Sequence, residues 1–449
     1  MTAEIKFFWQ RLNANYWFYP SLFAILAVVL AIAMIALDRA GFAAFLNDVK
    51  WLYPVRPNGA SGMLTVMAGS MIGVTSTVFS ITIAAVAYAS GNYGPRLLTN
   101  FMEDKGNQLS LAVFIGSFTY ALVVLRVVRA EDETPASMGD ATSTALPGFA
   151  PQLSLLVAYA LMAISIATLV FFLNHIPSSI RINSVLEGIG RRLLDTVRDT
   201  YPVENSFSDA REVEDGEPVR AWSTGYVQLI DFDDLQKVAR DCEATLSLCV
   251  RTGDFVHRDL PLMVAKGCDP EEIEDKVRRC FTLGATRTPS QDPQFLIDEL
   301  VEIGLRALSP GINDPFTAIT ALHWLGAATS DIGRRDLRKA IGRDKEGKGD
   351  DAGDVIPLPD NFAHYCQRGF GSIRSGVAAS PLAAEVMLDT IADAAAPLDD
   401  GRRRAILYEH GQELMEQARL VLAGPDLRNL ETTYDAFCRR TGAEHRSAT

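Results

Sequence analysis

Small and hydroxyl-bearing residues recur along one apolar stretch of the chain, residues 57–95. Their steps of three and four residues average close to the 3.6 residues of a helical turn, so they fall on one helix face. Small residues let another helix approach closely, whereas a row of hydroxyl oxygens can line a narrow ion path. Helix packing and ion conduction both remain open. The candidate residues are Gly62, Thr65, Gly69, Gly73, Ser76, Thr77, Ser80 and Ala84.

His175 and Pro177 end a later apolar stretch and predict a hinge. Proline removes a helical hydrogen bond and kinks the chain. Histidine is the side chain that most readily changes charge near neutral pH, although it could simply cap a helix here. Residues 177–202 then place apolar residues on one helical face with basic residues along the helix, which predicts an amphipathic helix at the membrane surface. This helix would either anchor to anionic lipid or transmit movements to the preceding span.

Two Asp-Pro pairs each precede a helical pattern, at 287–295 (RTPSQDPQF) and 309–318 (SPGINDPFTA). An aspartate followed by proline is typical of an N-cap and first helical position. We expect Gly311 to take the positive φ of the turn that closes the preceding helix. The alternative is that the two helix amino termini bind an anion or another small ligand. The residues concerned are Arg287, Asp292, Arg306, Ser309, Gly311, Asn313 and Asp314.

Sequence motifs of the common enzyme classes are missing from the chain. We find no Walker loop, no Gly-x-Gly-x-x-Gly, no His-Glu-x-x-His and no Gly-x-Ser-x-Gly. The six histidines lack ligand-like spacing, and the six cysteines, all beyond residue 241, form no zinc pattern. We therefore expect no catalytic residue, no metal and no cofactor. The acidic surroundings of the basic run 402–404 also argue against nucleic acid as a partner.

The two parts of the chain that contain these candidate residues, 1–176 and 177–449, differ sharply in net charge. The 449 residues have a formal charge of −13, yet residues 1–176 hold nine basic and nine acidic residues. Residues 177–449 therefore carry the whole excess. Four stretches of the first part lack charged residues and are long enough to cross a bilayer of about 30 Å. We place the spans near 17–37, 62–90, 107–127 and 152–174.

The flanking basic residues predict how these spans are oriented. Eight lie on the side that contains both termini and five on the other, which favours cytoplasmic termini. No charged side chain lies within a span core, which argues against a voltage sensor or a proton-coupled pump. Passive conduction, or none, remains.

Composition and periodicity predict an α-helical integral membrane protein with four transmembrane helices and an α+β cytoplasmic domain. We expect a small β-rich, barrel-like or half-sandwich part beside a helical bundle. The predicted segments are a four-helix membrane domain (1–176), the juxtamembrane helix (177–202), an acidic linker (203–218), the β-rich part (219–268), the helical part (269–440) and a disordered tail (441–449).

The segment around the second Asp-Pro pair, which we call the second junction, resembles a known family. ALSPGINDPFTA at 307–318 resembles the hallmark of the bacterial predicted membrane protein family catalogued as a domain of unknown function (DUF 2254). RTPSQDPQF at 287–295, GDFV at 253–256 and NHIPSSI at 174–180 resemble that family too. The resemblance implies a bacterial inner-membrane protein with four spans and a cytoplasmic tail. It implies no activity, cofactor or catalytic residue.

These patterns lead to two hypotheses of function. The first is an oligomeric ion channel or passive transporter whose second span lines or packs around the path, with the cytoplasmic domain regulating it. The acidic tail would then favour cations. The alternative is a non-conducting membrane scaffold or sensor whose cytoplasmic domain binds a partner or ligand. The expected partners are the lipid bilayer, further copies of the chain, and ions or a small cytoplasmic ligand.

Overall fold

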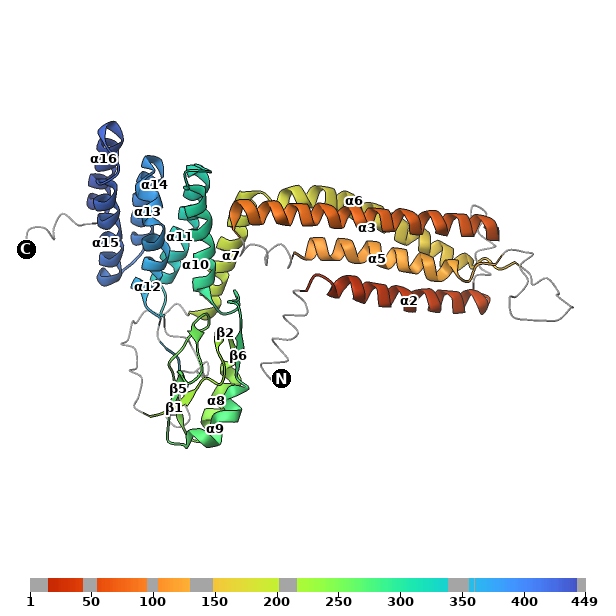
Figure 1. Cartoon of the computed structure of the whole chain (residues 1–449), viewed down its shortest axis with the longest axis horizontal. Helices are drawn as coiled ribbons and strands as arrows, with labels where there is room; N and C mark the ends of the chain where they lie inside the picture. The colour runs from red at the N-terminus through yellow and green to blue at the C-terminus, as the bar shows by residue number, and fades with distance from the viewer. Residues whose placement is uncertain are drawn as a thin grey trace, which may run out of the picture. The chain divides into compact units, whose positions relative to one another are not determined.

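The computed structural model describes residues 15–42, 55–94, 104–129, 148–201, 216–337, 355–358 and 360–441 (Figure 1). Two compact units emerge from the contacts within the chain. The membrane unit comprises Arg11–Gly91 and Pro95–Arg181, and the C-terminal unit is chiefly Ile182–Thr449.

In the part of the chain that the structure describes, four helices of the membrane unit are long and apolar enough to span a bilayer, as many as the sequence predicts. They are α2 (Phe18–Arg39), α3 (Pro57–Tyr93), α5 (Lys105–Leu125) and α6 (Gln152–Ser179). At about 1.5 Å per residue, the 37 residues of α3 extend for about 55 Å, well beyond the hydrocarbon core. This helix therefore tilts in the bilayer or projects from it.

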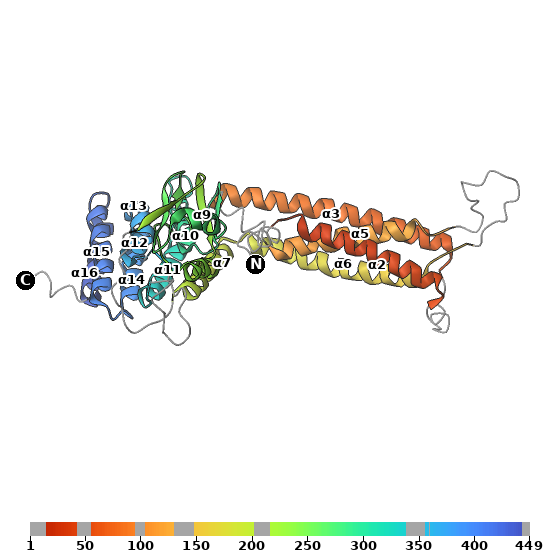
Figure 2. The same cartoon turned by 90° about the horizontal axis from the view of Figure 1, so that it is seen from below.

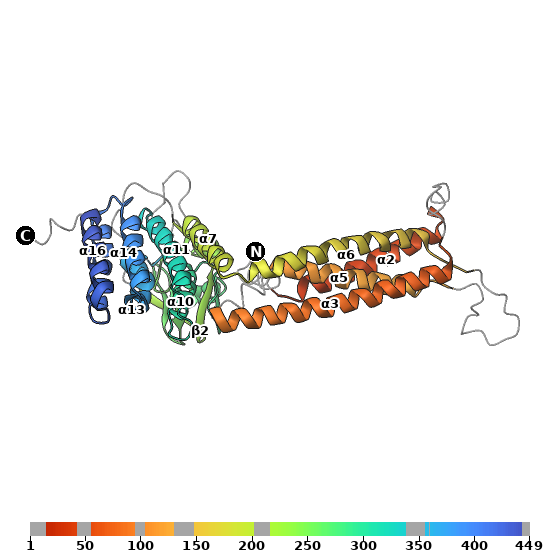
Figure 3. The same cartoon turned by 90° about the horizontal axis from the view of Figure 1, so that it is seen from above.

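α5 is the central helix of the membrane unit. Figures 2 and 3 view the unit from opposite sides, and in both α5 lies between α3 and α6. More of α5 is buried than of the other three helices. α5 packs extensively against α2, where Gly116 lies against Phe23. Ser117 of α5 and Ser165 of α6 share a hydrogen bond of 2.9 Å inside the bundle.

The C-terminal unit begins with α7 (Ile182–Thr200) and a region with two small sheets. One sheet has the strand order β1-β5-β3-β7 and the other β4-β2-β6. Neighbouring strands are antiparallel except β3 and β7. The strands are β1 (Glu217–Arg220), β2 (Gly225–Ile230), β3 (Thr245–Leu248), β4 (Phe255–Val256), β5 (Pro261–Lys266), β6 (Phe281–Gly284) and β7 (Val355–Ile356).

The barrel-like arrangement expected for this region is wrong, because neither sheet closes on itself in the described chain. The edge strands β4 and β7 have two residues each, too few to carry a hydrogen-bond ladder around a barrel. β6 and β7 also come from beyond residue 268, where the sequence pattern is helical. Both sheets, with α8 (Phe232–Asp241) and α9 (Pro270–Arg278), enclose one apolar core.

The rest of the unit is a set of helices that stand side by side (Figure 1). α10 and α11 form an antiparallel hairpin, in which Gly304 lies close to Ala321. α14 runs parallel to α11, because Gly326 approaches Thr390 and Gly333 approaches Leu398. The helices are α10 (Pro293–Ala307), α11 (Pro315–Gly333), α12 (Phe362–Cys366), the π-helical turn η3 (Gln367–Gly371), α13 (Ser372–Ala378), α14 (Pro381–Ala395), α15 (Gly401–Ala418) and α16 (Gly424–Thr441).

Candidate functional site

The stripe of small residues on α3 faces away from the membrane unit. The buried face of the helix is on the opposite side and includes Leu64, Met71 and Val78. A Cβ added at Gly62, Gly69 or Gly73 would meet no described atom within 4 Å outside its own helix. Among the residues that the structure describes, no other helix of the same chain lies against these glycines, so the structure gives packing within one subunit no support. The exposed candidates are Gly62, Thr65, Gly69, Gly73, Ser76, Thr77, Ser80 and Ala84.

Hydroxyl groups on this outward face donate their hydrogens to their own helix. Thr65 donates to the Ser61 carbonyl at 2.8 Å, Thr77 to Gly73 at 3.1 Å and Ser80 to Ser76 at 2.8 Å. A hydroxyl oxygen that has donated its hydrogen keeps its lone pairs as acceptors. The outward face therefore presents hydrogen-bond acceptors together with a smooth surface of small residues.

Charged groups at the ends of the spans connect the helices of the membrane unit. The Asp38 carboxylate at the end of α2 accepts hydrogen bonds from the amides of Leu153 and Ser154 at 2.8 and 2.9 Å, and from the Ser154 hydroxyl. It thereby caps α6 from another helix. Sequence analysis missed this role, since 115 residues separate Asp38 from Leu153 and local patterns carry no signal for it.

His175 meets Asp104 rather than capping a helix itself. Its Nε2 lies 2.7 Å from Asp104 Oδ2, while the other carboxylate oxygen accepts the Gly106 amide and so caps α5. The imidazole ring stacks on Phe171 and fills the space left by the missing side chain of Gly106. The hinge residue thus ties the end of α6 to the start of α5.

Pro177 lies inside α6, which continues to Ser179, and α7 begins at Ile182 after residues 180 and 181. The apolar face of α7, formed by Leu186, Ile189, Leu193 and Val197, is buried against α10 and α11. The expected lipid anchor is therefore wrong for this face, because other helices of the C-terminal unit already cover it. α7 is the first helix of that unit, joined to α6 by two residues.

The first junction is the most heavily charged cluster that sequence analysis pointed to. Arg287 donates from Nε and Nη2 to Asp292 Oδ2, at 3.0 and 2.6 Å, and from Nη1 to Asp298 at 2.7 Å. Arg368 of η3 donates two further hydrogen bonds to the Asp298 carboxylate, at 2.6 and 2.7 Å. Gly253, in the turn between β3 and β4, has φ +92° and lies so close that a Cβ there would overlap the Asp292 carboxylate.

This cluster is electrically balanced, with two guanidinium and two carboxylate groups paired to one another. Asp292 is 1% exposed and caps α10 by accepting the Phe295 amide at 3.1 Å. Burial raises the pKa of Asp292, and the charge and hydrogen bonds of Arg287 oppose the rise. The cluster joins three segments of the chain that are distant in sequence. Because the guanidinium of Arg287 already donates hydrogen bonds to internal carboxylates, it has little capacity left to bind an incoming anion. Asp298 and Arg368 were not predicted; no local motif marks them.

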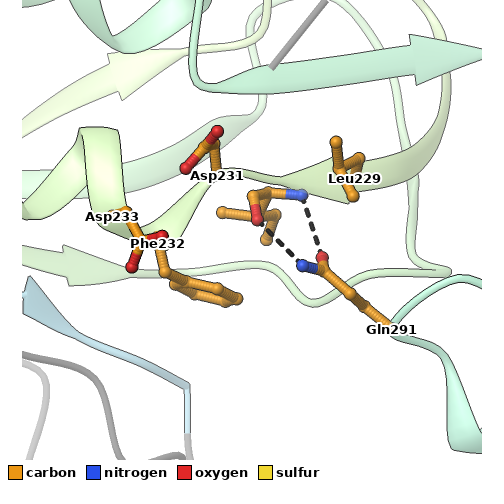
Figure 4. Close-up of a pocket in the computed structure, with 6 residues that line it drawn as sticks. Leu229, Asp231, Phe232, Asp233 and Gln291 are labelled. Atoms are coloured by element: carbon orange, nitrogen blue, oxygen red, sulfur yellow. Dashed lines mark hydrogen bonds between the residues drawn. The ribbon is translucent and has the colours of Figure 1, made fainter. Parts of the chain in front are cut away.

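Gln291, just before the capping aspartate, takes φ +56° and attaches the junction to β2. Its side-chain amide pairs with the backbone N–H and carbonyl of Ile230, both at 3.2 Å (Figure 4). The same residues border a cavity of about 180 Å³. Two carboxylates, Asp231 and Asp233, lie at its rim, and Asp231 already caps α8 through the Asp234 amide.

The second junction repeats this helix start at the surface. Asp314 caps α11 by accepting the Thr317 amide at 3.2 Å and the Thr317 hydroxyl at 2.6 Å. The expectation for Gly311 is wrong: Asn313 takes the positive φ, +51°. Asparagine tolerates this conformation well because its short side chain bonds locally. Ser309 donates to the Arg306 carbonyl at 2.6 Å and so helps to close α10.

The two junctions do not come together in one ligand site. The first lies at the start of α10 and the second beyond its end, 15 helical residues away. Among the residues that the structure describes, no group of three or more histidine, cysteine, aspartate or glutamate side chains could hold a metal ion.

Comparison with known proteins agrees with these features. The family model described as "Predicted membrane protein (DUF2254)" matches residues 13–393. An uncharacterized protein of Mycobacterium tuberculosis and one of Mycobacterium bovis are each 32% identical to this chain over 371 residues. Those alignments cover 79% of this chain and 67% of the relatives. No solved structure matches the chain.

Proposed function

We propose that this chain, which belongs to the DUF2254 family of predicted membrane proteins, forms a homo-oligomeric passive ion pathway in which α3 of each copy faces a shared axis. The observation that carries the proposal is the outward direction of the α3 stripe. Small residues facing lipid would make few contacts, whereas against another helix they allow close packing. The stripe is therefore the natural surface for a second copy.

Cations are the ions that this face suits best. The hydroxyl oxygens of Thr65, Thr77 and Ser80 point outward with their hydrogens already donated to the backbone. Rows of such acceptors can replace part of a cation's hydration shell. The acidic C-terminal residues 177–449 would raise the local cation concentration if they lie at the mouth of the path. We assign the protein to the bacterial inner membrane with both termini in the cytoplasm, following the distribution of basic residues.

Regulation by the C-terminal unit would act through α7. This helix is packed into that unit, and two residues connect it to α6. The contact between His175 and Asp104 then links the end of α6 to α5. A movement of α7 would therefore be transmitted through α6 to the start of α5.

The test combines subunit counting with ion flux in liposomes. Gly73→Leu introduces a large side chain on the stripe, at a position where a Cβ meets nothing in its own chain. The variant should fold normally but form a smaller oligomer and lose flux. Ile81→Leu, a volume-conserving change at another exposed position of α3, is the matched control.

Different outcomes separate the alternatives. A wild-type oligomer that carries neither cations nor anions would sink the conduction proposal and favour the non-conducting scaffold or sensor. A monomeric wild-type protein would exclude a path between subunits. An unchanged oligomer in Gly73→Leu would show that the stripe is not the contact.

A further inference from the structure

Large apolar side chains are exposed at few places in the described part of the C-terminal unit, and nearly all of them gather in three turns. Phe255, in the short strand β4, is the exception. The others lie at the α10–α11, α13–α14 and α15–α16 turns or on the first residues after them. We call these five the apolar edge: Ile312, Phe316, Leu382, Leu420 and Val421.

These three turns lie at one end of the row of helices. Gly376 of α13 approaches Leu305 and Leu308, next to the α10–α11 turn. α14 then runs parallel to α11, so both helices begin at this end. α15 begins at the opposite end, where Arg403 donates to the Gly333 carbonyl at 2.8 Å. Its last residues, and the turn into α16, are therefore back at the same end (Figure 1).

The backbone of the α10–α11 turn is fixed by hydrogen bonds, and its apolar side chains are exposed. The Asp314 amide donates to Ala307 at 2.8 Å, and the Asn313 amide donates to Ser309 at 2.9 Å. Phe316 is 70% exposed and Ile312 46% exposed. These residues form a fixed projection, and exposure of this kind costs free energy in water unless something covers it.

The apolar edge is nearly free of charge in an otherwise acidic part of the chain. Across residues 307–318, 377–384 and 420–425 the only ionisable side chain is Asp314, while Arg306, Arg419 and Asp426 directly adjoin these segments. Its carboxylate is occupied by the Thr317 amide and hydroxyl. An uncharged, apolar projection is suited to the boundary between lipid headgroups and acyl chains.

The chain enters the C-terminal unit from the span at this same end. α7 runs parallel to α11, because Gly190 lies against Trp324 and Arg198 pairs with Asp331 at 3.2 Å. The start of α7 is therefore level with the start of α11. Only residues 180 and 181 separate α7 from α6, a helix long and apolar enough to span the bilayer. A lipid surface attached through so short a link has a high effective concentration at this end.

We propose that the apolar edge docks on the lipid bilayer, with Phe316 and Ile312 inserted at the headgroup–acyl boundary. The contact would hold the C-terminal unit against the membrane at a second place besides α7. It is independent of ion conduction, since it requires neither an oligomer nor a path along α3.

Photo-crosslinking in proteoliposomes tests this contact with the full chain. Benzoylphenylalanine replaces Phe316 in one preparation and Phe255 in another. Phe255 is the matched control, because it is also an exposed phenylalanine, at 56%, and lies outside the apolar edge. Mass spectrometry then identifies what each site has captured in vesicles of phosphatidylcholine, with and without phosphatidylglycerol.

We expect a lipid adduct at position 316 in both kinds of vesicle and a much weaker one at position 255. Because Phe316 and Ile312 are uncharged, the lipid adduct at position 316 should not require anionic lipid. A crosslink from position 316 to a second copy of the chain would overturn the proposal and identify the edge as a subunit contact. No adduct at 316, or equal lipid adducts at both positions, would also overturn it.

Discussion

The junctions before α10 and before α11 start their helices in the same way. Gln291 and Asn313 both have positive φ, and the aspartates that follow have closely similar backbones, with φ −123° and −112° and ψ 85° in each. Each aspartate caps a helix whose first residue is proline. Local chemistry is thus shared down to the turn that precedes the cap.

Their surroundings differ completely. Asp292 is buried among Arg287, Gly253 and the sheet region, whereas the second junction leaves Ile312 and Phe316 exposed. The difference teaches that an Asp-Pro helix start says nothing about burial. Whether such a motif is part of the core or part of an interaction surface depends on which distant segments pack against it.

Removing the two capping carboxylates should give the largest contrast. Asp292→Ala loses a cap, and Arg287 loses its charge-assisted hydrogen bonds to Asp292, so we expect a loss of about 3 kcal/mol in the free energy of unfolding. Asp314→Ala loses a surface cap, worth about 1 kcal/mol. Chemical denaturation of the intact chain in detergent measures both. Equal losses would mean that burial of the first junction contributes nothing.

A methyl group added to a glycine near each junction should give the next largest contrast. Gly253→Ala combines a positive φ with overlap onto the Asp292 carboxylate, and we expect a cost of about 2 kcal/mol. Gly311→Ala meets nothing within 4 Å and should change stability by less than about 0.5 kcal/mol. Thermal unfolding of the two variants side by side checks this. A tolerated Gly253→Ala would contradict the close packing described here.

The smallest expected effect is a pH dependence at the buried junction. Asp292→Asn keeps a capping oxygen but cannot ionise. Because burial raises the pKa of Asp292 above its ordinary value of 3.8, the folded state holds this proton more tightly than the unfolded state. Wild-type stability relative to Asp292→Asn should therefore be greatest below pH 3.8 and fall as the pH rises through the raised pKa.

Denaturation curves of both proteins across that range measure this difference, and Asp314→Asn serves as the matched reference at the exposed junction. A relative stability that rises with pH would show that Arg287 outweighs burial.

Much of the fold could be predicted because its signals are local. Uncharged stretches of about 20 residues identified the four spans, and Asp-Pro pairs identified the starts of α10 and α11. Short strands such as β6 and β7 escaped prediction, since two to four residues show no periodicity. The barrel was wrong because strand pairing is decided by partners far away in the sequence.

For the candidate residues too, local spacing predicted some features and contacts between distant segments decided the others. For the α3 stripe, helical spacing by itself determined that the small residues share a face. Only the tertiary structure decided that this face points outward, since α5 and its neighbours cover the opposite side. For α7 the amphipathic pattern was clear, yet an apolar face can be buried either in lipid or against other helices. The packing of α10 and α11 made that choice.

Composition and spacing by themselves determined which segments are apolar enough for a membrane, where helices start, and that the whole −13 lies beyond residue 176. Tertiary structure alone decided which of two similar junctions is buried and which helix face remains uncovered. The physical reason is range. Helix caps, turns and hydropathy act over a few residues, whereas burial and charge pairing depend on contacts between residues as distant as Gly253, Arg287 and Arg368.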